Sequence, residues 1–139
     1  MAFDITALET QLLTDIETTS IVDATASFIG LRTTFPNAWL EWRAEEDLEQ
    51  LDLNGASRHR MPVDIIAEGD TKDQVNDAIH EIQQLWYANA NAKLVVLNST
   101  SGVIDIEIGT LFRPNLPDGA AIVGKVYGGL SIVIVADDL

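Results

Sequence analysis

The sequence contains no cysteine among its 139 residues. Disulfide bonds, thiolate metal ligands and cysteine nucleophiles are therefore excluded, and the fold depends on its apolar core. The absence of cysteine leaves the cellular compartment open.

Positive charge is also scarce. The chain has 22 acidic against 8 basic residues, a net charge of −14, and its only lysines are Lys72, Lys93 and Lys125. A chain this acidic repels the phosphate backbone, which argues against a sequence-specific nucleic-acid binder. An acidic wall would instead let DNA slide past without sticking. The same balance fits a protein from a high-salt habitat and an ordinary acidic protein about equally well.

Long apolar runs are missing as well. No run reaches the roughly 18 residues that a membrane-spanning helix needs. The first residues, MAFDITALETQ, carry acids and no basic start, so they do not resemble a signal peptide. With 47% hydrophobic and 22% charged residues, we expect a single folded domain over residues 1–139, away from membranes.

No catalytic motif is present: there is no G-x-S-x-G elbow, no Walker loop and no H-E-x-x-H. The two histidines, His59 and His80, are not at metal-ligand spacing, and His80 falls on the polar side of its helix, where we expect it to be solvated. Asp105 and Glu107 flank Ile106 as a paired-carboxylate site would, but acids on the wet face of a strand are usually just solvated. We therefore expect no enzyme, no cofactor and no metal.

The clearest pattern in the chain is an amphipathic helix that follows Gly69-Asp70 and ends in the Asn/Ala run of residues 88–92. Thr71 can cap its first turn, with Gln74 three residues later as in a capping box. Its apolar residues recur at three- and four-residue spacing and share one face: Val75, Ala78, Ile79, Ile82, Leu85 and Trp86. This helix needs a sheet to lie on, which the strands predicted over 61–68 and 94–97 can supply.

A second helix is predicted at the N-terminus. Asp4 or Thr6 opens it, and the β-branched run of residues 18–22 ends it. Its apolar stripe consists of Ile5, Leu8, Leu12 and Ile16, with Leu13 widening it. The stripe packs on its own domain or on a neighbouring subunit, and the pattern leaves both open. Residues 21–34 give no clear prediction, with 27–31 either a short strand or a turn.

Four further stretches predict the rest of the sheet. Residues 38–45 alternate as a strand whose wet face carries Trp39, Glu41 and Arg43, and they pair antiparallel with residues 61–68. Residues 103–111 form a half-buried strand with Ile104, Ile106 and Ile108 on one side, and a loop follows over 112–119. The strand over 122–135 contains Gly124, Gly128 and Gly129, which indicate a bulge, a bend or the close approach of another backbone. The expected fold class is α+β: a mixed, mostly antiparallel sheet packed against two helices, with a long acidic hairpin loop.

That loop, residues 45–57, holds the candidate functional residues. It is acidic, has an Asn54-Gly55 turn signal, and contains leucines with no evident place in the core. The leucines either anchor a partner or fold back as a partial helix over the hairpin. The basic cluster that follows either neutralises the preceding acids or docks on an acidic neighbour or DNA phosphate. The candidate assembly contacts are Glu45, Glu46, Asp47, Leu48, Leu51, Leu53, Arg58, His59 and Arg60.

The predicted order is a helix, a hairpin with a long loop, a second helix and three strands. The second hairpin strand reads RHRMPVDIIAEGD and runs straight into the helix, and the final strand reads VYGGLSIVIV. From Leu8 to Val135 this pattern resembles the tail terminator, or tail-completion, proteins of long-tailed bacteriophages and related archaeal viruses. The match is one of pattern and length, without a signature motif.

The resemblance implies a virion structural protein that is assembled in the host cytoplasm. Proteins of that family form a hexameric ring at the head–tail neck, which ends the tail tube and joins it to the head–tail connector. Here the ring would leave an acidic channel through which viral DNA passes without sequence-specific binding. The family has no catalytic residues to transfer. Two alternatives stay open: another neck or tail-tube ring subunit, and a stand-alone acidic binding module.

Overall fold

The computed structural model describes residues 4–27, 34–46, 48–88, 102–112 and 126–138, which hold two helices and six strands. In chain order these are α1 (Ile5–Ile16), β1 (Asp23–Thr25), β2 (Asn37–Trp42), β3 (Glu49–Gln50), β4 (Ser57–Gly69), α2 (Lys72–Ala88), β5 (Val103–Phe112) and β6 (Val126–Asp138). The strands lie in the order β1-β2-β4-β6-β5, and β3 pairs with β4. The β1–β2 pair is parallel and the other pairs are antiparallel. The predicted α+β class, a mostly antiparallel mixed sheet with two helices, is confirmed.

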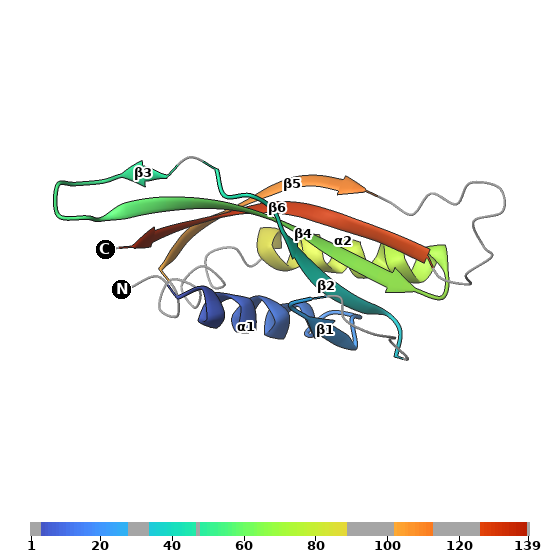
Figure 1. The fold of residues 1–139 in the computed structure, drawn as a ribbon. Helices are drawn as coiled ribbons and strands as arrows, with labels where there is room; N and C mark the ends of the chain where they lie inside the picture. The colour runs from blue at the N-terminus through green and yellow to red at the C-terminus, as the bar shows by residue number, and fades with distance from the viewer. Residues whose placement is uncertain (1–3, 28–33, 47, 89–101, 113–125, 139) are drawn as a thin grey trace.

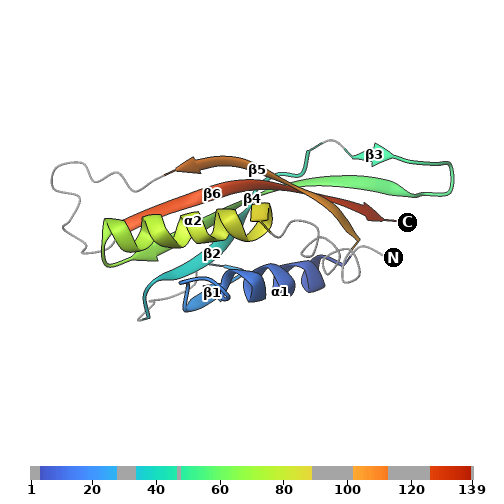
Figure 2. The ribbon, with the colours of Figure 1, turned by 180° about the vertical axis from the view of Figure 1, so that it is seen from behind.

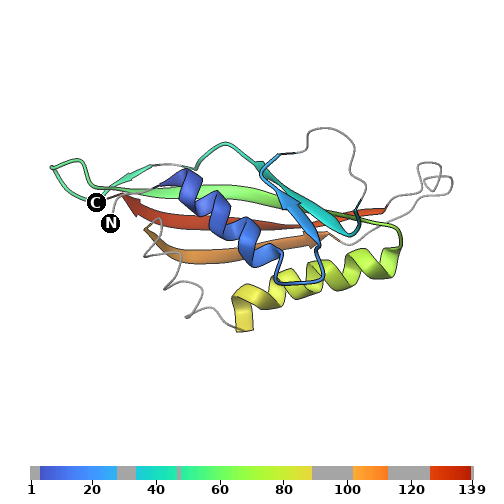
Figure 3. The same ribbon diagram turned by 90° about the horizontal axis from the view of Figure 1, so that it is seen from below.

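Both helices lie on the same face of the sheet, α2 along β4 and β6, and α1 beside β1 (Figures 1 and 3). Side chains alternate along each strand, so every second residue of β4 and β6 points toward the helices. The opposite face carries no helix among the described residues, as the view from behind also shows (Figure 2). We call it the open face.

The core lies between the helices and the sheet. The predicted stripe of α2 is confirmed: Val75, Ala78, Ile79, Ile82 and Trp86 are buried, and Leu85 packs half-buried at the margin. In α1 the stripe begins one turn later than predicted, because Ile5 is 40% exposed while Leu8, Leu12 and Ile16 are fully buried. Opposite them lie the helix-facing side chains of the long strands: Met61, Val63, Ile65, Leu130, Ile132 and Ile134.

Side-chain caps define where both helices start. Asp4, one of the two predicted openers, caps α1 by accepting a hydrogen bond from the Ala7 amide at 3.1 Å. In α2 the Thr71 hydroxyl accepts from the Gln74 amide at 3.1 Å, as predicted. The Gln74 side chain returns to the amide of Asp70 at 2.7 Å, one residue earlier than in the usual capping box. These bonds satisfy amides that the helix itself leaves unpaired.

The antiparallel pairing predicted between residues 38–45 and 61–68 is confirmed over Asn37–Trp42 and residues 63–68, with two corrections. Trp39 shares the open face with Glu41 and Arg43, as predicted, but it is not wet: it is 6% exposed, because the ring of Tyr127 packs edge-on against it at 6.2 Å between centroids. β4 is longer than predicted and contains Pro62 in its middle. The carbonyl of Pro62 accepts from the Arg43 amide just where the β2 ladder ends, so no amide hydrogen is needed there.

A register shift in β5 overturns the predicted single face for its three isoleucines. The pairing with β6 slips between Val103 and Asp105, so Val103 is fully buried and Ile104 is 36% exposed. Beyond the slip, Ile106 and Ile108 pack against the core as predicted. One extra residue in a strand is enough to exchange its two faces.

Of the three interpretations of the glycines in β6, close approach of another backbone is confirmed: a Cβ at Gly128 would lie 3.0 Å from the Phe112 carbonyl oxygen, and one at Gly129 would lie 2.7 Å from the Ile65 carbonyl oxygen. A Cβ at Gly128 would lie 2.6 Å from Cδ1 of Ile79, so the absence of a side chain at Gly128 allows α2 to pack closely on the sheet. A Cβ at Gly129 would meet the ring of Phe112. The predicted loop 112–119 is wrong at Phe112, which is the last residue of β5, and its remaining residues lie outside the described part of the chain. Gly124, the predicted strand 94–97 and most of the stretch 27–31 also lie outside it.

Candidate assembly surface

Residues 45–46 and 48–60 form an arm that extends well past both helices (Figure 1). In it β3 pairs with the start of β4, with Glu49 opposite Arg58 and Gln50 opposite Ser57. The single long acidic loop expected over residues 45–57 is therefore not confirmed, because the short strand β3 pairs with β4 in the middle of this stretch. Backbone hydrogen bonds continue this pairing beyond β3 on both sides, from Glu46 to Arg60 at 2.9 Å and from Leu51 to Ala56 at 2.8 Å.

The tip of the arm is an ordered turn. The Asp52 carboxylate accepts hydrogen bonds from the amides of Asn54 at 2.7 Å and Ala56 at 3.2 Å. Gly55 has a φ of +95°, a conformation that glycine adopts without strain. The predicted Asn54-Gly55 turn is confirmed, and its side chain–backbone bonds hold the tip in one shape.

Three leucines project from this arm into solvent. Leu48 is 59% exposed, Leu51 is 37% exposed and Leu53 is 97% exposed. None of them belongs to the core cluster, and the described part of the arm contains no helix. The alternative in which they fold back as a partial helix is therefore wrong. We call these three residues the leucine tip.

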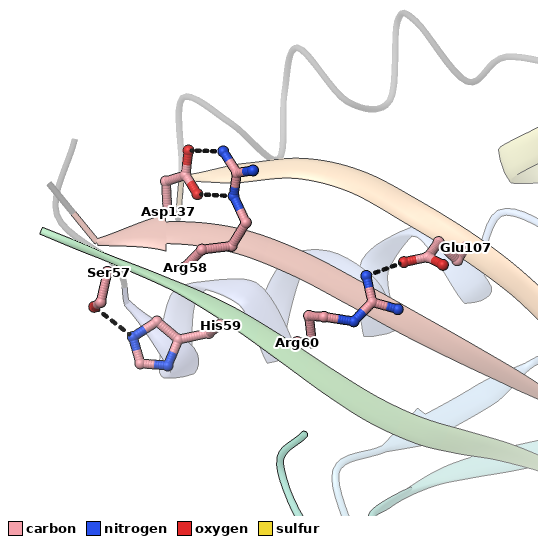
Figure 4. A network of polar contacts seen from close by, with 6 residues as sticks. All are labelled: Ser57, Arg58, His59, Arg60, Glu107 and Asp137. Carbon is pink, nitrogen blue, oxygen red and sulfur yellow. Dashed lines mark hydrogen bonds and ion pairs between the residues drawn. The ribbon is translucent and has the colours of Figure 1, made fainter. Parts of the chain in front are cut away.

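The basic cluster is fully paired with acids. Arg58 makes a bidentate contact with Asp137 of β6, at 2.8 and 3.1 Å. Arg60 bridges Glu46 at 2.9 Å and Glu107 of β5 at 2.6 Å. His59 contacts Glu45 through Nδ1 and Ser57 through Nε2. Figure 4 shows the contacts of Arg58, His59 and Arg60 with Asp137, Ser57 and Glu107.

These pairs fasten the base of the arm to the sheet. The hydrogen bonds to Asp137 raise the pKa of Arg58, and the same bonds lower the pKa of Asp137. The pKa of Arg60 is also raised above its ordinary value. The hydrogen bond to Glu107 is the largest cause and the hydrogen bond to Glu46 is the second. The neutralising role predicted for the cluster is what the geometry shows, although two of its acids, Glu107 and Asp137, come from distant strands. Asp47 is the one candidate contact outside the described residues.

The open face has an apolar row at the end opposite the arm, which the sequence did not predict. Strand register places Trp39, Ile66, Gly129 and Phe112 side by side across β2, β4, β6 and β5. The ring of Phe112 lies over Gly129 and is 39% exposed, and Tyr127 beside the row is 46% exposed. We call these four residues, together with Tyr127, the aromatic row. In the sequence, only the pair Gly128-Gly129 points to this row. The pair predicts that another group approaches the strand closely, but it does not indicate which residue that is.

Beside the aromatic row, on the same face of the sheet, lies a buried polar group. Glu68 is 5% exposed and accepts from the Asn37 amide group at 3.1 Å. The Tyr127 hydroxyl also bonds to Glu68, which raises the pKa of Tyr127. These bonds hold the Tyr127 ring in place at the surface, since its hydroxyl is tied to a carboxylate from the neighbouring strand.

Within the described ranges, no group of three or more His, Asp or Glu side chains is placed to hold a metal ion. Asp105 is exposed and Glu107 pairs with Arg60, so the two carboxylates have different surroundings. His80 is exposed on α2, as predicted. No helix among the described residues is long and apolar enough to cross a membrane.

No family model matches this chain, and a search of curated proteins also found no match.

Proposed function

We propose that this protein is a virion structural protein, a ring-forming tail terminator at the head–tail neck. In this role the ring, hexameric in the family it resembles, ends the tail tube and joins it to the connector proteins. DNA passes through the ring along an acidic wall, without sequence-specific contacts. Assembly takes place in the host cytoplasm.

The observation that carries the proposal is the leucine tip. Leu53 is almost completely exposed on an ordered turn that stands away from a well-packed core. Burial of exposed leucine is favourable, and an exposed apolar cluster on a rigid projection is typical of a protein–protein contact. A subunit that ends a tube and meets a connector needs such contacts.

The charge supports the second part of the proposal. The chain carries −14 overall, and among the described residues the arginines on the open face, Arg43, Arg58 and Arg60, are each paired with an acid. A surface of this kind repels phosphates, so DNA moves along it instead of binding. Net charge on every copy also makes self-association sensitive to salt.

The first experiment is native mass by light scattering or mass spectrometry, at low and at molar salt. The proposal expects a closed ring near the hexameric size in molar salt, where the charge of each copy is screened. Negative-stain microscopy of the same sample then separates a single ring from the stacked rings that a tube subunit would form. A monomer at both salts would contradict the ring and favour a stand-alone acidic binding module.

A further inference from the structure

The leucine tip and the aromatic row lie at opposite ends of the same strand. β4 starts at Ser57, beside the tip, and ends at Gly69, beyond the aromatic row. Its 13 residues span roughly 40 Å at the rise of a β-strand. The arm and the row therefore cannot meet within one chain.

We infer that the leucine tip of one copy packs on the aromatic row of the next copy, so that the ring is built head to tail. This inference rests on the proposed function, because it assumes that copies of the chain assemble. Its basis is the presence of two different exposed apolar surfaces on one molecule, Leu53 on the arm and Phe112 with Tyr127 on the open face. A contact between two different surfaces repeats from copy to copy and closes into a ring when the rotation allows.

Both surfaces are shaped before they meet. Asp52 and Gly55 set the turn that carries Leu53. On the other side, Glu68 holds the hydroxyl of Tyr127, and Gly129 leaves room for the ring of Phe112. Surfaces that are already ordered lose less conformational entropy on association than mobile ones.

The size of the contact determines which assemblies are stable. A stable interface buries about 800 Å² on each partner, or about 20–30 residues a side. The turn at the tip of the arm consists of residues 51–56, a small part of such an interface. One contact is thus too small to hold a dimer against the repulsion of two copies at −14 each. A closed ring, in which every copy makes two contacts, is held by all of them together. We expect monomers and closed rings, with few open intermediates.

The chain has no cysteine, so introduced thiols report contacts without background. The test variant carries Leu53→Cys with Phe112→Cys and is oxidised in the salt that gives rings. Head-to-tail packing predicts a ladder of covalent multimers on a denaturing gel. At micromolar protein, thiols held together in the ring have an effective concentration in the millimolar range, so the initial rate of disulfide formation should exceed that of a non-contacting pair roughly a thousandfold.

The matched control is Leu53→Cys with His80→Cys, since His80 is exposed on the helix side of the sheet. Leu53→Cys with Tyr127→Cys replaces the test variant if Phe112→Cys fails to fold by circular dichroism. A ladder in the test pair and none in the control supports the inference. Rings that form without the ladder overturn this interface and leave the proposed function standing. A wild-type chain that stays a monomer at every salt contradicts the proposed function itself.

Discussion

Gly128 is a position where one missing methyl group sets the distance between α2 and the sheet. Its absent Cβ would lie 2.6 Å from Ile79 Cδ1, 3.0 Å from the Phe112 carbonyl oxygen and 3.1 Å from Val75 Cγ1. Real Cβ atoms essentially never come within 3.0 Å of another heavy atom, so a side chain here forces the helix or its side chains to move.

Gly128→Ala should therefore destabilise the fold by about 1–3 kcal/mol, the usual range for overpacking. Urea denaturation followed by circular dichroism measures this free energy. Ile79→Val removes the Cδ1 atom that the new methyl would meet, and costs about 0.5–1.5 kcal/mol alone. The double variant should lose less stability than the sum of the two single variants. Strict additivity would show that the two sites do not touch.

Tyr127 is the residue whose titration reports the buried polar group. Its hydrogen bond to Glu68 raises its pKa, so the folded state holds the phenolic proton more tightly than the unfolded state. The stability that this bond contributes is fully present below the ordinary tyrosine pKa. It is lost as the pH rises through the raised value in the folded state.

We predict that one of the two tyrosines titrates late in an alkaline spectrophotometric titration of the phenolate. Tyr127→Phe should remove that late step and leave the other tyrosine unchanged. The variant should also lose less stability than the wild type between the ordinary and the raised pKa. A late step that persists in Tyr127→Phe would assign it to Tyr87.

At the scale of elements, local patterns predicted the helices and the long strands, and tertiary contacts decided the rest. The stripe of α2 and the caps at Asp4 and Thr71 depend on residues within a few positions of each other. β1 has only three residues and exists through its pairing with β2. The slip in β5 exposes Ile104 because of the partner strand, which no local alternation reveals. Short-range signals therefore predict elements better than they predict which face is buried.

The cap of α2 gives an element-scale prediction. Thr71→Ala removes the acceptor of the Gln74 amide and should cost about 0.5–2 kcal/mol of unfolding free energy, most of which Thr71→Ser should retain. The matched control is Thr14→Ala in α1, where the hydroxyl donates to the Thr10 carbonyl inside a helix. That change should be neutral or slightly stabilising, because alanine favours the helix interior. Equal losses at Thr71 and Thr14 would contradict a capping role. Thermal or urea unfolding measures both.

At the scale of the whole molecule, half of the proposed contact was visible in the sequence and half was not. The leucine tip is local: its three residues lie within a six-residue stretch that has no apolar periodicity. The aromatic row joins Trp39, Phe112 and Tyr127, which are up to 88 positions apart and come together only through the register of four strands. A surface built from long-range pairing has no sequence pattern of its own, so only the fold reveals it.

Replacing Leu48, Leu51 and Leu53 with serine tests whether the molecule uses its arm for assembly. All three lie outside the core, so the free energy of unfolding should change by no more than about 0.5 kcal/mol per site, as for other surface positions. Native mass in molar salt should fall to the monomer, since the apolar part of the contact is gone.

Leu12→Ala is the opposite control. Leu12 is fully buried in α1, and its truncation should cost about 2–5 kcal/mol while the folded fraction still forms rings. The two variants thus separate stability from assembly. If the triple serine variant unfolds, the leucines belong to the core after all, and if it still forms rings, the copies meet through another surface. Loss of the ring with the unfolding curve unchanged is the result expected only when the arm is a dedicated contact. In that case the leucines stay exposed in the monomer because they are buried in the ring.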